Sequence, residues 1–299
     1  MNGRRWEWPT ISIAVLLYGG FCLLTWHWQA MPVWLAAPLC GLLLAWHSSL
    51  QHETIHGHPT SSERLNELIG IPPLSLWLPY AVYRELHLAH HANGGRDLTD
   101  PQADPESHYR RPGTLAAAGR LERQALRWHA TLAGRLLLGP ALLVMRCWKT
   151  EVLRLAYDRR RRGIWLRHAL AVIPLLVWVV WICRIPIETY LLLAVYPSIS
   201  LSLLRSYTEH RAAPDSRHRT AVVEAGSFWS LLFLNNNLHV VHHRHPELPW
   251  YRLPAVWREL RPTLEPGPGM LYGGGYAEIA ARHLFAAAAP VEHPGFERR

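Results

Sequence analysis

The chain has 299 residues, of which 49% are hydrophobic and 18% are charged, and 31 basic against 22 acidic side chains give a formal net charge of +9. This composition excludes a disordered or collagen-like chain, and four cysteines over this length exclude a small disulfide-stapled domain. The mean hydropathy of −0.02 hides the fact that the apolar residues are bunched.

The N-terminal region contains no Asp, Glu, Lys or Arg from Trp8 through Gln51. At about 1.5 Å of helix per residue, this stretch can cross a hydrocarbon core of ~30 Å about twice. Polar residues and Pro32 interrupt it after Trp26. The pattern predicts an integral membrane protein that begins with a helical hairpin, whose spans are at about 11–26 and 33–49.

A later apolar region predicts a second hairpin, with spans at about 164–182 and 187–204 and a turn that contains Arg184. Segment 131–148 is weaker, because Arg135 and Arg146 leave too few uncharged residues between them for a crossing. We therefore expect it to lie flat on the membrane surface or beneath the spans. The predicted fold class is an all-α integral membrane protein with four transmembrane helices in two hairpins.

The distribution of basic residues predicts the orientation. The two short hairpin turns contain one basic residue, Arg184, and the remaining ones lie in tails, spans or long loops. The positive-inside rule then places both termini and the loop 50–163 in the cytoplasm. We expect a single membrane-embedded domain over residues 1–262 and a mostly irregular cytoplasmic extension over 263–299. Lys149 is the single lysine among many arginines, which favours a bacterial source and an inner-membrane location.

Three of the sequence's histidine clusters stand where the predicted spans end or in the loops on the same face. They are His52-Glu53-Thr54-Ile55-His56, His87-Leu88-Ala89-His90-His91 and His239-Val240-Val241-His242-His243. On a helix, spacings of i, i+3 and i+4 place imidazoles on one face, where two can share a metal ion. Neutral imidazole favours Fe, Zn, Cu or Ni over Mg or Ca, and the spacing does not choose among them.

Two other classes of function fit part of this pattern. His52-Glu53-Thr54-Ile55-His56 has the H-E-x-x-H form of a zinc protease, in which the glutamate acts as the general base. A protease, however, leaves the other two clusters without a role. A metal transporter or sensor would carry its ligands within the spans, whereas these clusters lie just outside them.

With these residues in view, the sequence resembles the integral-membrane fatty acid desaturase superfamily, which includes alkane hydroxylases and carotenoid hydroxylases and ketolases. The motifs that carry the resemblance are the three histidine clusters in this order, extended to Gly57-His58 in the first and to Asn237 and Arg244-His245-Pro246 in the third. The resemblance covers roughly residues 10 to 250. It implies a cytosolic helical cap over four spans and a di-iron centre held almost wholly by histidine.

Carried over position by position, the resemblance implies nine iron ligands. Eight come from the three clusters and one from the segment Tyr207-Thr208-Glu209-His210 after the last span: His52, His56, His87, His90, His91, His210, His239, His242 and His243. His58 and His245 flank the clusters, as supporting or merely interfacial residues. Ligating imidazoles usually bond a carboxylate through their other nitrogen. Candidate carboxylates are Glu53, Asp97, Asp100, Asp104 and Glu209, and Asn237 is a candidate for orienting a bound water or capping a helix.

The implied activity is an O2-dependent removal of hydrogen from an unactivated C–H bond of a lipid. We expect a double bond in a fatty acyl chain, and the alternative is hydroxylation or ketone formation on an alkane, lipid or carotenoid. The geometry around the second hydrogen decides between these products, and the sequence does not show it. The chain has neither the four-cysteine spacing of an iron–sulfur site nor a dinucleotide motif, so an external donor of the ferredoxin, rubredoxin or cytochrome type is implied. No nucleic acid partner is expected.

Overall fold

The computed structural model describes residues 6–265, 267 and 269–295. Within them the chain is mainly helical and divides into two compact units, which are described separately. The first unit comprises Met1–Glu85 and Pro140–Ser202, and the second comprises Leu86–Gly139 and Leu203–Arg299. Three helices, α4 (Tyr80–His91), α7 (Leu132–Tyr157) and α10 (Tyr196–Ser206), contain the points at which the chain passes between units.

Four helical segments among the described residues are long and apolar enough to cross a membrane: Trp8–Trp26, Val33–Ile55, Arg159–Ile182 and Ile187–Ser206. They confirm the four predicted spans, while the pairing into membrane hairpins and the cytoplasmic orientation stay predictions. The structure extends the second span by a helical turn and a half, so that it includes His52. Helix α7 covers segment 131–148 and is not among the four, as expected for a segment that contains Arg135 and Arg146.

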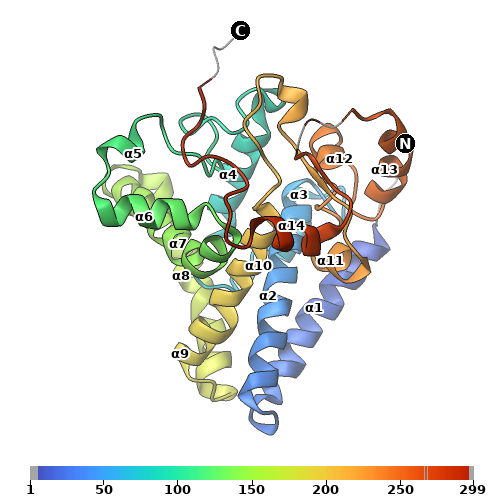
Figure 1. Ribbon diagram of the computed structural model, residues 1–299. Coiled ribbons are helices and arrows are strands. Elements are labelled where there is room, and N and C mark those ends of the chain that lie inside the picture. Colours follow the sequence, from blue (N-terminus) through green and yellow to red (C-terminus); the bar gives the residue numbers. More distant parts are fainter. Residues whose placement is uncertain (1–5, 266, 268, 296–299) are drawn as a thin grey trace. The chain divides into compact units, whose positions relative to one another are not determined.

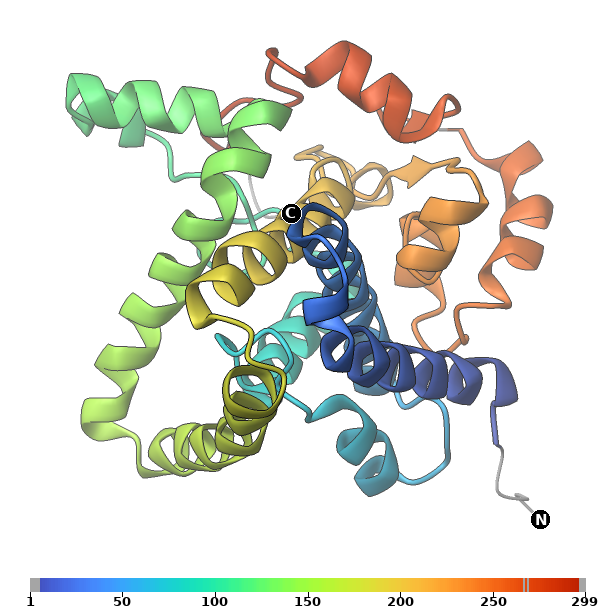
Figure 2. The same ribbon diagram turned by 90° about the horizontal axis from the view of Figure 1, so that it is seen from below.

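The first unit is built around the apolar helices. Its elements are α1 (Trp8–Trp26), η1 (Trp28–Ala30), α2 (Val33–Ile55), α3 (Glu63–Gly70), α8 (Arg159–Leu176), η3 (Val177–Ile182), α9 (Ile187–Tyr190) and η4 (Leu191–Val195). Helices α1 and α2 lie side by side in both views (Figures 1 and 2). Helix α2 also packs closely on η4. At the contact, a Cβ added to Gly41 would lie only 3.3 Å from the carbonyl oxygen of Ala194.

Local polar signals set the helix ends of this unit. Ser62 accepts a hydrogen bond from the Leu65 amide at the start of α3, and Asp158 accepts one from the Arg161 amide at the start of α8. Pro32 and Pro186 precede α2 and α9, where the missing amide hydrogen costs no helical bond. These residues mark where α2, α3, α8 and α9 begin.

The second unit is made of short elements. They are η2 (Ala92–Gly95), α5 (Thr114–Ala117), α6 (Arg120–His129), η5 (Ser216–His218), β1 (Val222–Val223), α11 (Ser227–Leu232), α12 (His239–Arg244), α13 (Leu253–Leu260), η6 (Arg261–Thr263), β2 (Leu271–Tyr272) and α14 (Gly275–His283). Strands β1 and β2 pair in parallel, with Val222 opposite Leu271. A buried apolar cluster that includes Val241, Leu253 and Trp257 packs α12 and α13 against β1.

The segment after residue 262 takes part in this unit. It supplies β2 and the nine-residue helix α14, and residues 284–293 then run back along the unit. Arg110 exchanges backbone hydrogen bonds with Val291 and His293 (2.8 and 2.9 Å), and the Ala133 amide donates to Leu284 (3.0 Å). We call residues 284–293 the C-terminal strap. It is irregular, but its backbone is fastened to the unit at both ends.

Candidate metal centre

The first histidine motif lies at the C-terminal end of α2 in the first unit. His52 is in the last turn of the helix and His56 is its C-cap, and the centroids of the two rings are 4.8 Å apart. His52 is buried, with its Nδ1 3.7 Å from Glu53 Oε1. His58 lies just beyond and hydrogen bonds through Nδ1 to Glu7 Oε1 at 2.8 Å. The two predicted ligands therefore share a helix end, and His58 is engaged by a carboxylate of its own.

The other predicted ligands all lie in the second unit. Three are on α4, three are on α12, and His210 follows α10, where its backbone bridges to Thr220. The apolar residues Val240 and Val241 are buried in the core, which directs the histidines of α12 to the other side of this short helix. Asn237 anchors the start of α12: its Nδ2 donates to the Val223 carbonyl (2.8 Å), and its own carbonyl accepts from the Val223 amide (2.9 Å).

The seven histidines of the second unit form two groups. In the group made of His90, His210, His239 and His243, the potential ligand atoms all lie within 4.8 Å of one another. We call this group site B. In the other group, His87, His91 and His242 are equally close, with Nε2 of His91 3.1 Å from Nε2 of His242. We call these three residues site A. Each site draws on both α4 and α12, so each combines motifs that are far apart in sequence.

The outward-facing nitrogens of these rings have oxygen partners. His90 Nδ1 bonds Asp104 Oδ1 at 2.8 Å, and His87 Nδ1 bonds Glu106 Oε1 at 2.9 Å. His239 Nδ1 bonds Asn236 Oδ1 at 3.0 Å, and His210 Nδ1 bonds the Arg219 carbonyl at 3.3 Å. A histidine that donates from Nδ1 presents the lone pair of Nε2, which is the usual arrangement of a metal-ligating imidazole.

The facing Nε2 atoms of site B provide a test of whether these residues fit a metal. Nε2 of His239 lies 2.9 Å from Nε2 of His210 and 3.1 Å from Nε2 of His243. Because the Nδ1 atoms of His239 and His210 face oxygen acceptors, their Nε2 lone pairs point at each other, which is unfavourable unless a cation lies between them. Nε2 of His90 is also buried and has no hydrogen-bond partner among the described residues. This donor set fits a metal ion.

The protonation of four of the rings, His91, His210, His239 and His243, is compatible with ligation. Burial, together with the neighbouring imidazoles, lowers the pKa of His91 and of His210 to about 3, and it holds the pKa of His239 and His243 well below the usual value. These rings are therefore neutral at pH 7, the form that binds metals. Burial lowers the pKa of His90 as well, but Glu106 and Asp104 outweigh it and raise that pKa to about 9.

The remaining predicted partners have other contacts. Asp100 accepts the amides of Gln102 and Ala103 and so forms the turn before Asp104, and the Asp97 carbonyl accepts the Asp100 amide. Glu209 lies 3.2 Å from Arg205 and 3.7 Å from His239 Nδ1, and burial raises its pKa to about 7. His245 is partly exposed beside Glu247.

Two side-chain partners of the predicted ligands were not predicted from the sequence, Glu106 and Asn236. The signals that could have found them are modest: Glu106 follows Asp104 by two residues, and Asn236 stands three residues before His239. A search for oxygen-bearing side chains within a few residues of each motif would have included Asn236. It would not have included Glu106, which a loop brings back to His87.

Comparison with known proteins agrees with this site. The model of the family described as "Fatty acid desaturase" matches residues 26–274, which contain all nine predicted ligands. A β-carotene ketolase of Paracoccus sp. (strain N81106 / MBIC 01143) is 25% identical over 226 residues, covering 72% of this chain and 73% of that protein. The two matches argue against the zinc protease alternative suggested by the first motif. They show that the chain is an oxidoreductase of the membrane desaturase and hydroxylase type. The chain belongs to the fatty acid desaturase family.

Proposed function

We propose that this protein is an O2-dependent di-iron oxidoreductase that introduces a double bond into a fatty acyl chain. The observation that carries the proposal is the pair of histidine sites A and B, whose rings present Nε2 atoms to one another. In this proposal the nine predicted histidines, His52 and His56 included, are the iron ligands. A bound iron pair, with O2 and electrons, supplies the oxidising power needed to break an unactivated C–H bond.

The protein's own residues hold and orient the metal ligands. Asp104 and Glu106 fix the His90 and His87 rings through Nδ1, and Asn236 does the same for His239. Burial keeps the His210 and His239 rings neutral and limits the access of water to them. Oriented and dehydrated imidazoles bind a metal with little reorganisation, so the site is rigid before substrate arrives.

The membrane setting supports a lipid substrate, because four apolar helices belong to the same chain as the histidines. We propose that the acyl chain reaches the site from the bilayer and that the termini and the metal site face the cytoplasm of a bacterial inner membrane. An external donor of the ferredoxin, rubredoxin or cytochrome type is proposed to deliver the electrons. The described cysteines are unpaired and lie at four scattered positions, which suits packing rather than a redox cluster.

Lipid profiling after expression tests the proposed reaction. Membranes of a host that makes saturated acyl chains are expected to gain new double bonds only with O2 and with the wild-type chain, and the His90→Ala variant serves as the inactive control. Gas chromatography with mass spectrometry locates the new bond in each acyl chain. Unchanged lipids with an intact, iron-loaded protein would reject acyl desaturation.

Oxygenation of a carotenoid is the second candidate function, and the likeness to the β-carotene ketolase favours it. Expression in a host that accumulates β-carotene separates the two candidates, because a new keto or hydroxyl group shifts both the mass and the absorption of the pigment. Keto-carotenoid without altered acyl chains would replace the proposed desaturation with this function.

A further inference from the structure

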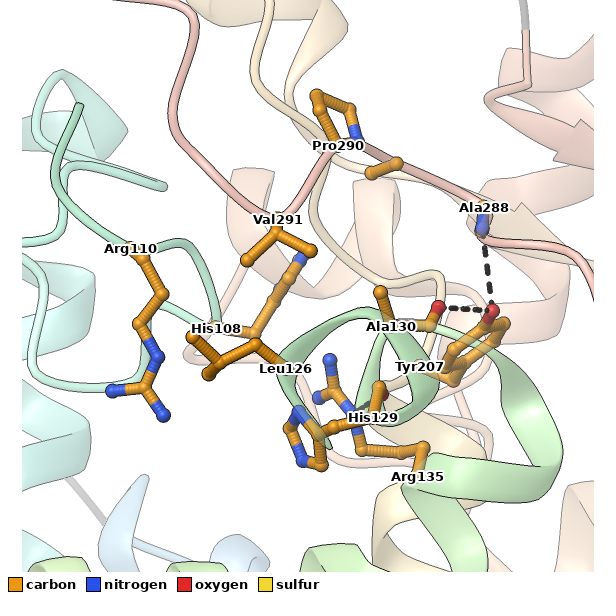
Figure 3. A pocket seen from close by; sticks show the side chains of 11 residues that line it. His108, Arg110, Leu126, His129, Ala130, Arg135, Tyr207, Ala288, Pro290 and Val291 are labelled. Atoms are coloured by element: carbon orange, nitrogen blue, oxygen red, sulfur yellow. Dashed lines mark hydrogen bonds between the residues drawn. The ribbon is translucent and has the colours of Figure 1, made fainter. Parts of the chain in front are cut away.

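A small cavity in the second unit is lined by cationic side chains and lies apart from every predicted metal ligand. Figure 3 shows Arg135, His129 and Tyr207 below the cavity and residues Ala288, Pro290 and Val291 of the C-terminal strap above it. His108 and Arg110 complete the polar lining, and no acidic residue contributes to it. The cavity offers about 20 Å³ to the centre of a water-sized group.

Arg135 carries a positive charge into this space without a compensating carboxylate. It is 6% exposed, and its Nε has only a long contact of 3.5 Å to the His129 carbonyl. Its guanidinium also lies 5.8 Å above the centroid of the Tyr207 ring. Among the described residues it has no ion-pair partner, although buried charges in proteins are usually paired. The Tyr207 hydroxyl cannot replace one, because it donates to the Ala130 carbonyl at 2.8 Å (Figure 3).

Other groups around the cavity add to the positive potential. Arg135 stands in the first turn of α7, where the helix dipole disfavours a cation, so helix stability does not explain it. Burial, and after it the charge of Arg135, hold the pKa of His108 and His129 low, so both rings are neutral near pH 7 and each offers one N–H donor. Glu292, the nearest acid on the strap, accepts the Leu115 amide.

We propose that this cavity binds a phosphate-type oxyanion, with Arg135 as the principal ligand, His108 and His129 as neutral donors, and Arg110 at the rim. A guanidinium fork with imidazole N–H groups matches the geometry of phosphate oxygens. The phosphate can belong to a lipid headgroup or be free in solution. The inference does not depend on the reaction proposed above, and its test needs no turnover.

The test uses the purified full chain in nanodiscs of zwitterionic lipid. Titration with inorganic phosphate is expected to raise the unfolding temperature of the wild type. Arg135→Gln should weaken phosphate binding and raise its dissociation constant by about tenfold to one hundredfold, the range for a lost charge-assisted hydrogen bond. Without phosphate, the same variant should unfold at the wild-type temperature or above it, because an uncompensated buried charge has been removed. Arg127→Gln, which changes an exposed arginine on α6, is the matched control and should bind phosphate normally.

Nanodiscs that contain phosphatidic acid distinguish the two sources. If the headgroup is the ligand, the lipid raises the unfolding temperature of the wild type but not of Arg135→Gln, and added phosphate has no further effect. If free phosphate is the ligand, only the ion acts. The rim variant Arg110→Gln keeps the test informative should Arg135→Gln fail to fold, since it should weaken binding with little structural change. Absence of any response to either source, or equal responses in the wild type, Arg135→Gln and Arg110→Gln, would overturn the proposal.

Discussion

Replacement of Asp104 by Asn tests whether a buried carboxylate controls the basicity of a predicted iron ligand. Asp104 Oδ1 lies 2.8 Å from His90 Nδ1, and the two side chains are 2% and 1% exposed. Loss of such a partner costs about 10- to 100-fold in metal affinity, or ~1.4–2.8 kcal/mol. The NH2 group of the new amide also has to face either the Thr99 amide, which Asp104 Oδ2 accepts at 2.9 Å, or the Glu106 amide, which Asp104 Oδ1 accepts at 2.9 Å. That mismatch adds about 1–3 kcal/mol of lost folding stability.

Metal titration of the folded fraction, isolated by gel filtration, separates these two effects. The expected result is a weaker iron affinity in that fraction together with a lower unfolding temperature. Asp215→Asn is the control, because that carboxylate is on an exposed turn and pairs with Arg217. If folded Asp104→Asn bound iron as tightly as the wild type, the proposed role of Asp104 in positioning His90 would be refuted, whatever the loss of stability.

Three further predictions address the metal site and the fold. His90→Ala should abolish turnover with little loss of membrane insertion, measured by lipid profiling and membrane fractionation, and retained turnover would remove His90 from the site. Glu151→Gln should lower the free energy of unfolding by about 3 kcal/mol, because it leaves the buried Arg161 with only Glu85 as its carboxylate partner, and denaturant titration checks this. Iron retention against a chelator should decrease as the pH falls below about 9, because protons then compete for His90, whereas His91 and His210 stay neutral down to about pH 3; equal retention at pH 9 and pH 7 would contradict ligation by His90.

The spans were predictable because their signal is local. A run without formal charges from Trp8 to Gln51 has few alternatives to membrane helices, and the structure differs mainly in extending the second span to Ile55. The sequence did not predict where the individual helices between the second and third spans begin and end. Helices α3 and α6 are amphipathic, and their stability depends on the tertiary contacts of one face rather than on composition.

The motifs predicted a set of histidines but not how that set divides. On α4, the i, i+4 pair His87 and His91 goes to site A while His90 goes to site B. On α12, the i, i+4 pair His239 and His243 goes to site B while His242 goes to site A. Residues four apart lie almost above one another on a helix, whereas adjacent ones diverge by about 100°. The division follows from that geometry, but which pair joins which site depends on how α4 and α12 pack.

The carboxylate partners show the limit of reasoning from spacing. Asp104 was among several candidates, and its contact with His90 depends on a turn in which the Asp104 amide bonds the Asp100 carbonyl at 3.0 Å. Glu106 was not a candidate, although it bonds His87. Both contacts come from the path of a loop, which no helical or strand periodicity encodes.

The iron content of the purified chain tests the central claim most directly. Reconstitution with ferrous iron under anaerobic conditions, followed by metal analysis, should give about two irons per folded chain for the wild type. His239→Ala, which removes a ligand of site B, should leave about one, held by site A. A single tightly bound zinc, or an iron content that His239→Ala does not change, would contradict the two-site di-iron centre.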